Sequence, residues 1–313
     1  MSRFEALVAS DVAPLLTAEL PTVDGGGLDA VRERLEGVAE WVDAMNATDN
    51  TSAHAHASPV ATSIALLQLG VEPVLQLVCR DRNRLALEAD IVGAALHGVE
   101  NICCLTGDDV TAGDEPEARR VFDLDSPQLI ATAATLASGR YLSGRALEPA
   151  PHLFVGAVEN PSAPPYAYRV DRAFKKVRAG ARFFQLQICF DHELLSAFMS
   201  AAVSSGLAAE AALLPSICLV GSPAGLRYMD EKVPGISIPA ETIARVEAAA
   251  DPTEACFELG AELAAAALDL PGVAGLHVIS FRHDRGVDRL CRRLGIPPRS
   301  EREASGYRSQ IAV

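Results

Sequence analysis

Residues 71–105 read VEPVLQLVCRDRNRLALEADIVGAALHGVENICCL, and this stretch contains one strand–helix–strand unit. The apolar runs 71–78 and 101–105 have the length and composition of buried strands. Residues 83–97, between them, have the pattern of a helix, and Gly98 suits the C-terminal end of that helix. Because parallel strands need such a crossover, the unit indicates an α/β fold.

The same alternation recurs along the whole chain. Helix-like stretches separate most of eight short apolar runs, and nearly every run ends at or just before a polar or charged residue. This pattern predicts an α/β protein of the (β/α)8 class, a TIM barrel, with its functional residues at the carboxyl ends of the strands. The predicted strands are 13–20, 41–47, 71–78, 101–105, 152–157, 183–188, 213–218 and 275–280.

The length fits one such barrel, since 313 residues lie within the usual range for this fold. No change in composition marks a linker, so we predict a single domain over residues 1–313. Residues 1–12 are expected to form a helical lead-in, and residues 297–313 a loosely ordered tail.

The composition excludes several classes of protein. Hydrophobic residues make up 49% and charged residues 22%, which allows a large core and argues against global disorder. The formal net charge of −14 disfavours binding to nucleic acid and to anionic membranes, because both need a basic face. A local basic pocket can still bind a small anion.

The seven cysteines indicate a reducing compartment. Their number is odd and no C-x-x-C pair occurs, so we expect buried thiols rather than disulfides or a zinc cluster. The sequence shows no signal peptide and no apolar stretch of about 18 residues. We therefore predict a cytoplasmic protein without a membrane span.

Polar residues at three predicted strand ends could carry chemistry. Glu19 ends the first strand, where an acid is costly unless it is paired or acts as a general acid. Gly107 allows close approach of the backbone to a ligand and precedes Asp108, and the amide of Gln187 could contact a heterocycle. From these patterns alone, a rim salt bridge explains Glu19 equally well, an ordinary turn explains Gly107 and Asp108, and a barrel-lining amide is the favoured interpretation of Gln187.

Other motifs point away from common alternatives. His54 and His56 are spaced like zinc ligands but lie in a loop without evident companion ligands, so we expect no metal site. The charged segment 79–84 is expected to form salt bridges around a loop rather than to hold an anionic ligand. No dinucleotide-binding glycine motif, phosphate-binding loop or nucleophile elbow is present.

Taken together, six segments resemble the methylenetetrahydrofolate reductase family. The resemblance covers about residues 13–296 and depends on the order and spacing of the motifs. The regulatory domain of eukaryotic members has no counterpart, so the chain is similar to the bacterial type. The segments are TAELP (17–21), MNATDN (45–50), LQLVCRD (75–81), LTGD (105–108), KKVRAGA (175–181) and QLQICFD (185–191).

This resemblance implies an enzyme that reduces 5,10-methylenetetrahydrofolate to 5-methyltetrahydrofolate with NADH or NADPH as electron donor, through bound FAD. It assigns Glu19 as the acid that opens the folate ring and Asp108 as a catalytic residue close to folate and flavin. It further assigns substrate contacts to Gln187, Asp108, Arg282 and His283, and cofactor contacts to Thr48, Gln76, Thr106, Gly107, Asp108 and Lys176.

Some of these positions depart from the family pattern. Gln76 and Thr106 stand where histidine and arginine are frequent, and Val158 stands where a flavin-contacting tyrosine is common. Two alternatives therefore stay open: a flavin-independent folate-dependent reductase or methyltransferase with the same pocket, and a non-catalytic folate-binding subunit. The sequence does not decide between NADH and NADPH, nor whether the protein forms a homo-oligomer.

Overall fold

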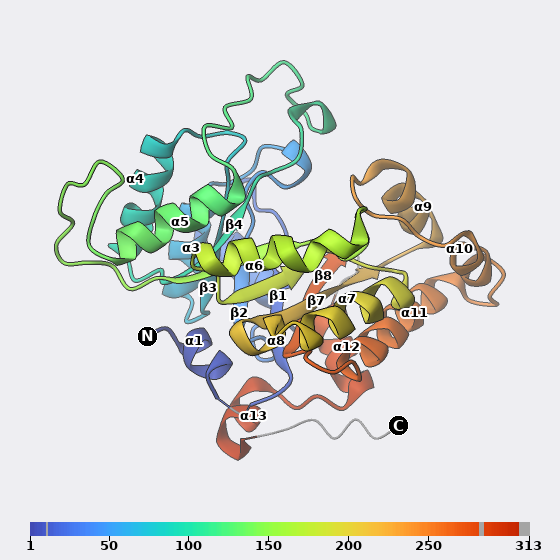
Figure 1. The fold of residues 1–313 in the computed structure, drawn as a ribbon. Coiled ribbons are helices and arrows are strands. Elements are labelled where there is room, and N and C mark those ends of the chain that lie inside the picture. Colours follow the sequence, from blue (N-terminus) through green and yellow to red (C-terminus); the bar gives the residue numbers. More distant parts are fainter. Residues whose placement is uncertain (11, 282–284, 307–313) are drawn as a thin grey trace.

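A computed structural model describes residues 1–10, 12–281 and 285–306, and it confirms the predicted (β/α)8 barrel. Eight parallel strands pair in chain order, and β8 closes the sheet against β1 (Figure 1). The strands are β1 (Leu15–Glu19), β2 (Ala44–Ala47), β3 (Pro73–Val78), β4 (Asn101–Leu105), β5 (Phe154–Glu159), β6 (Phe183–Leu186), β7 (Ala212–Val220) and β8 (Gly275–Phe281).

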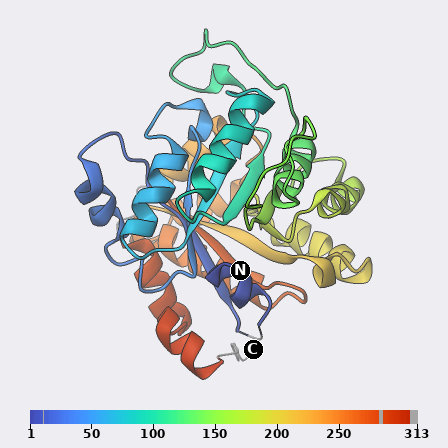
Figure 2. The ribbon, with the colours of Figure 1, turned by 90° about the vertical axis from the view of Figure 1, so that its left-hand side faces the viewer.

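Helices surround the barrel and connect successive strands (Figures 1 and 2). In the described residues, none of them is long and apolar enough to cross a membrane. They are α1 (Arg3–Val8), α2 (Gly27–Leu35), α3 (Pro59–Gln68), α4 (Arg84–Ala95), α5 (Ser126–Ala137), α6 (Arg169–Ala179), α7 (His192–Ser204), α8 (Leu207–Glu210), α9 (Pro223–Lys232), α10 (Ala240–Glu247), α11 (Pro252–Leu268), α12 (Gly286–Leu294) and α13 (Arg299–Ser305). Short 3₁₀ turns are η1 (Thr51–Ala53), η2 (Val110–Ala112) and η3 (Tyr166–Tyr168).

Alternation along each strand divides the barrel into an outer and an inner face. In β1, Leu16 and Ala18 are buried in the large cluster that packs the sheet against the helices, whereas Leu15 belongs to a separate cluster at the base of the barrel. There the ring of Phe4 from α1 meets Phe154 and Phe183 edge-on, at centroid distances of 5.9 and 5.3 Å. The lead-in helix thus closes the amino end of the barrel with an aromatic plug.

A missing side chain in β5 makes room for this plug. A Cβ added to Gly156 would overlap the ring of Phe183, which is fully buried. We expect Gly156→Ala to destabilise the protein by about 1–3 kcal/mol, because the core must shift to accept the methyl group. Urea unfolding monitored by circular dichroism measures this effect. Gly25→Ala is the matched control, since its Cβ would meet no atom within 4 Å; equal unfolding midpoints for both variants would contradict this packing.

Part of the tail that was predicted to be loosely ordered, residues 297–313, forms a helix, and residues 307–313 lie outside the described part of the chain. Residues 299–305 form α13, and Arg302 is fully buried beneath the barrel. Its guanidinium donates to both carboxylate oxygens of Asp43 (2.9 and 3.0 Å) and to the backbone oxygen of Pro14 (2.8 Å). Asp43 also accepts from the backbone N–H of Leu16 at 2.6 Å. These contacts join the starts of β1 and β2 to the last described helix, so residues 299–305 are part of the fold.

Candidate active site

The three polar residues predicted at strand ends lie at the same end of the barrel. Glu19 is the last residue of β1, Gln187 follows β6 directly, and Asp108 lies three residues after β4. All strands of the barrel are parallel, so their carboxyl ends share one rim. The side chains of Glu19 and Gln187 are partly exposed and that of Asp108 is exposed, as expected for groups at an open mouth.

A chain of buried polar groups fills the barrel below Glu19. Asn46 and Gln185 exchange two amide hydrogen bonds of 2.7 and 2.9 Å across the barrel. Gln185 also donates to the hydroxyl of Thr17 (3.4 Å), which lies 2.8 Å from Nδ1 of His277. All four side chains are at most 2% exposed. Polar groups this deeply buried persist because they satisfy one another.

The hydrogen bonds of this network place the imidazole of His277 next to Glu19. Gln185 accepts from Asn46 through its oxygen, so its nitrogen is the donor toward Thr17. In the tautomer in which Nδ1 of His277 accepts the Thr17 hydroxyl proton, the imidazole N–H lies on Nε2. That nitrogen lies 3.8 Å from Oε1 of Glu19, whose side chain is 22% exposed. In that tautomer, the buried network holds an N–H on the side of the imidazole nearest the carboxylate at the mouth.

His277 and Asn46 were missed as site residues in the sequence. Each lies inside an apolar run, where a single polar residue is easily read as incidental. For Asn46 the available signal is a pair of polar residues two positions apart, as in Thr17 with Glu19, Asn46 with Thr48 and Gln185 with Gln187, whereas His277 has no such partner. Since alternate strand residues share a face, the inner member of each pair belongs to the network and the outer member to the rim.

Asp108 is held beside a buried arginine. Partial desolvation raises the pKa of Asp108, and the nearby charge of Arg80 opposes that rise. Arg80 is 2% exposed, and its Nη1 donates to the backbone oxygen of Asp108 at 3.3 Å. Gly107 adopts a φ of +93°, and a Cβ there would lie 3.1 Å from the side chains of both Val78 and Arg80. A glycine is thus required where the chain turns into the mouth.

The charged segment after β3 forms the predicted salt-bridge network. Arg80 donates to both oxygens of Asp81 at 2.7 Å, and Arg84 pairs with Asp123 at 2.8 Å. Arg82 binds the buried carboxylate of Asp49. Burial raises the pKa of Asp49, while the charge of Arg82 and the backbone N–H of Val78 lower it. These pairs fix the loops after β2 and β3 next to the mouth.

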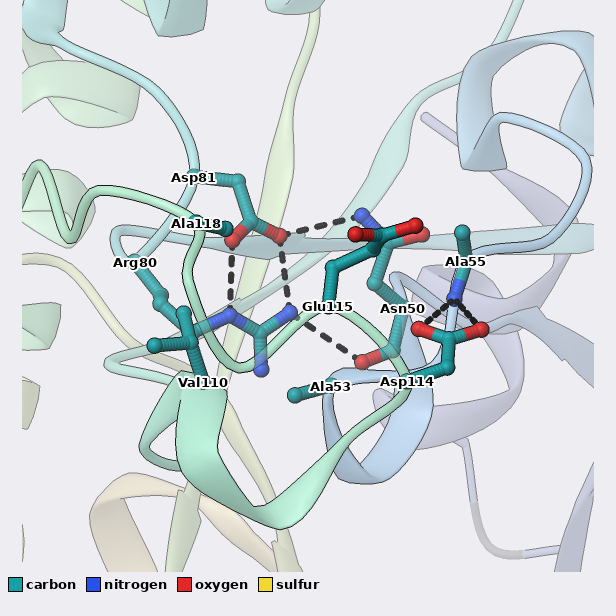
Figure 3. A pocket seen from close by; sticks show the side chains of 9 residues that line it. All are labelled: Asn50, Ala53, Ala55, Arg80, Asp81, Val110, Asp114, Glu115 and Ala118. Carbon is teal, nitrogen blue, oxygen red and sulfur yellow. Dashed lines mark hydrogen bonds and ion pairs between the residues drawn. The ribbon is translucent and has the colours of Figure 1, made fainter.

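A small hollow of about 130 Å3 opens between these loops and the loop after β4 (Figure 3). Arg80, Asp81 and Asn50 form its hydrogen-bonded wall, and the carboxylate of Asp114 accepts from the backbone N–H of Ala55 at 3.2 Å. The remaining lining residues are Ala53, Val110, Glu115 and Ala118. Drug-sized ligands occupy about 300–1,000 Å3, so the hollow can take only a small group of a larger ligand.

Five of the six residues assigned to the cofactor by resemblance lie on or just after the adjacent strands β2, β3 and β4, and Lys176 lies on α6. Thr48 and Gln76 are nearly buried in the barrel wall, and the hydroxyl of Thr106 accepts from the backbone N–H of Ser126 at 3.3 Å. Lys176 is 4% exposed, and its ammonium donates to the carboxylate of Glu159 (2.9 Å) and to the backbone oxygen of Val158 (2.5 Å). Burial lowers the pKa of Lys176, and Glu159 opposes that shift.

The histidine pair engages in local contacts. Nδ1 of His54 lies 3.0 Å from the backbone oxygen of Ser52, and Nδ1 of His56 lies 3.0 Å from that of Ala57. Within the described ranges, no group of three or more His, Cys, Asp or Glu could hold a metal ion. Arg282 and His283, assigned to the folate substrate, lie outside the described residues.

Fold and site together define a (β/α)8-barrel protein that carries Glu19, Gln187 and Asp108 at the carboxyl-terminal rim of the barrel. The family model of methylenetetrahydrofolate reductase matches residues 25–295, and the chain belongs to this family. A comparison with curated protein sequences finds no match.

Two solved structures share the fold. One is an uncharacterised protein from Clostridium thermocellum that binds two copies of 5-methyl-5,6,7,8-tetrahydrofolic acid, with a TM-score of 0.64 and 14% identity over 93% of this chain and 97% of that one. The other is the EDTA monooxygenase EmoA from Chelativorans sp. BNC1, with a TM-score of 0.50 and 10% identity over 90% and 98% of the two chains. At these identities the likeness concerns the fold alone.

Proposed function

We propose that this protein reduces 5,10-methylenetetrahydrofolate to 5-methyltetrahydrofolate with NAD(P)H as electron donor. One observation carries the proposal: Glu19 stands at the mouth, with its carboxylate 3.8 Å from Nε2 of His277 at the end of a buried chain of polar groups. Family membership supports folate as the substrate. The clostridial neighbour binds 5-methyltetrahydrofolate, which is the product of the proposed reaction.

In this proposal Glu19 supplies the proton that ring opening needs. The bond between the methylene carbon and N10 of the folate breaks as Glu19 protonates N10, which leaves an iminium at N5. A hydride then adds to the methylene carbon and converts it to the N5-methyl group. The sum is one methylenetetrahydrofolate, one NAD(P)H and one proton consumed, and one methyltetrahydrofolate and one NAD(P)+ formed. Asp108 and Gln187 bind and orient the pterin from the same rim.

Two cations that could bind the phosphates of FAD are already paired with carboxylates. Lys176, the residue assigned to its phosphates, is buried and already neutralised by Glu159. Arg80, close to Asp108, is likewise paired with Asp81. A pyrophosphate placed at either cation would have to displace a carboxylate, and separating a buried ion pair costs several kcal/mol. We therefore favour direct hydride transfer from the nicotinamide to the folate.

A visible spectrum followed by an activity assay tests this proposal. We expect the purified protein to lack the absorbance of an oxidised flavin and to oxidise NAD(P)H only when methylenetetrahydrofolate is added. A yellow protein whose colour is lost on addition of NAD(P)H would contain a reducible flavin. That result would contradict direct hydride transfer but would remain compatible with the reductase activity. If no NAD(P)H is oxidised with or without added FAD while 5-methyltetrahydrofolate still binds, the protein is a folate-binding subunit instead.

A further inference from the structure

One layer of side chains inside the barrel, between the aromatic plug and the mouth, is polar. Bulky apolar residues ordinarily fill the interior of a (β/α)8 barrel. Here the amides of Asn46 on β2 and Gln185 on β6 meet, and both residues are at most 2% exposed. In the closed order of eight strands β2 and β6 lie four strands apart, so this amide pair crosses the barrel from one wall to the opposite wall.

Each amide lies next to a residue that the proposed reaction uses. Asn46 is paired in register with Glu19 on the neighbouring strand β1. Gln185 lies two residues before Gln187 along the chain. Its nitrogen also donates to the hydroxyl of Thr17 at 3.4 Å, two residues before Glu19. The amide pair thus connects the wall that carries the acid with the wall that carries the amide at the rim.

The amide pair contributes direction more than stability. A buried amide gives up its hydrogen bonds to water, and the reciprocal bonds of 2.7 and 2.9 Å largely offset that loss. Apolar side chains of the same size would fill the space without needing a partner. Hydrogen bonds, unlike apolar contacts, constrain both distance and angle. Two amides at the centre of a barrel therefore indicate a geometric role.

We propose that Asn46 and Gln185 are positioning residues, which hold the carboxyl group of Glu19 in a fixed place relative to Gln187 and so to the pterin. The assignment rests on the proposed function, because a reaction that needs an acid gives the position of Glu19 its purpose. Both amides are buried below the mouth, so they act through Glu19 and not by contact with the substrate. They do so through the register of β1 with β2 and through the polar chain that ends at His277, 3.8 Å from the carboxylate.

A double variant of matched size tests this role without leaving a buried amide unpaired. Asn46→Leu combined with Gln185→Met keeps the volume of both side chains and removes both amides together, which limits the loss of stability. We expect kcat for the reduction of methylenetetrahydrofolate to fall at least about tenfold, because a misplaced catalytic group loses its alignment with the leaving group. The loss should appear in kcat rather than in KM for the folate, since the amides do not contact the substrate.

The Glu19→Gln background separates positioning from a general loss of structure. If the amide pair acts through Glu19, the double variant lowers kcat in the native background and leaves the residual kcat of Glu19→Gln unchanged. An equal loss in both backgrounds, or no loss in the native one, overturns the inference while the reductase activity stands. A native protein that does not reduce methylenetetrahydrofolate overturns the proposed function, and the inference with it.

The next link in the polar chain gives a second test with a smaller change. Thr17→Val keeps the shape of the side chain but removes the hydroxyl that joins Gln185 to His277. We expect kcat to fall about tenfold in this variant as well, and Thr17→Ser to restore it. Thr132→Val is the matched control, because it removes a buried hydroxyl from the outer helix α5 and should keep the native kcat. Equal kcat values for the two valine variants would refute the positioning role.

Discussion

Replacing Glu19 with glutamine should lower kcat for the reduction of methylenetetrahydrofolate by about 10²–10⁴-fold, the usual contribution of a positioned general acid. Glutamine keeps the size and polarity of the side chain, so the contact with His277 is retained while the transferable proton is lost. The amine leaving group must then depart without protonation. Initial rates of NAD(P)H oxidation, measured with saturating folate, give the effect directly.

A matched variant separates this role from a general effect of charge at the rim. Glu193→Gln makes the same chemical change in the first turn of α7, where the side chain is exposed and outside the buried network. We expect this control to keep its native rate, and both variants to bind 5-methyltetrahydrofolate and to melt as the native protein does. A Glu19→Gln enzyme that turns over normally would remove the acid from the proposed mechanism.

The barrel could be predicted because its strands are encoded locally. β3 and β4 are flanked by polar turns, and the predicted runs cover both. The prediction for β2 began at residue 41, three residues before the observed strand. Residues 41–43 are apolar or adjoin apolar residues, but they lie at the base of the barrel and not in the strand. There the carboxylate of Asp43 and the backbone oxygen of Trp41 both accept hydrogen bonds from Arg302. That partner lies 259 or more positions away, and periodicity does not reveal it.

The candidate site, too, could be predicted only in part from the sequence. The common location of Glu19, Asp108 and Gln187 could be predicted because a polar residue at a strand end is visible in the sequence and the fold gathers all strand ends on one rim. The partners of these residues were not visible. The burial of Lys176 against Glu159 joins α6 to β5, and the network of His277, Thr17 and Gln185 joins three strands across the barrel. Such pairings depend on register and closure, which only the three-dimensional structure supplies.

The second large effect concerns stability at the opposite end of the barrel. Arg302→Met should lower the free energy of unfolding by about 3–5 kcal/mol, the usual cost of removing one partner from a buried ion pair. The substitution leaves the Asp43 carboxylate fully buried, with only the N–H of Leu16 in place of the charged donors. Burial alone raises the pKa of Asp43, and Arg302 is the main group that counteracts it. Urea unfolding followed by circular dichroism measures the loss.

A double-mutant cycle shows whether the loss of stability in Arg302→Met comes from the unpaired charge of Asp43. Asp43→Asn combined with Arg302→Met removes both charges, so the double variant should be more stable than the sum of the two single losses predicts. Arg293→Met, which breaks an exposed pair with Glu258, is the control and should change stability by no more than about 1 kcal/mol. If Arg302→Met is no more harmful than this control, α13 does not anchor the base of the barrel. Simple additivity in the cycle would instead mean that Arg302 acts through its bonds to the backbone of Pro14 and Trp41.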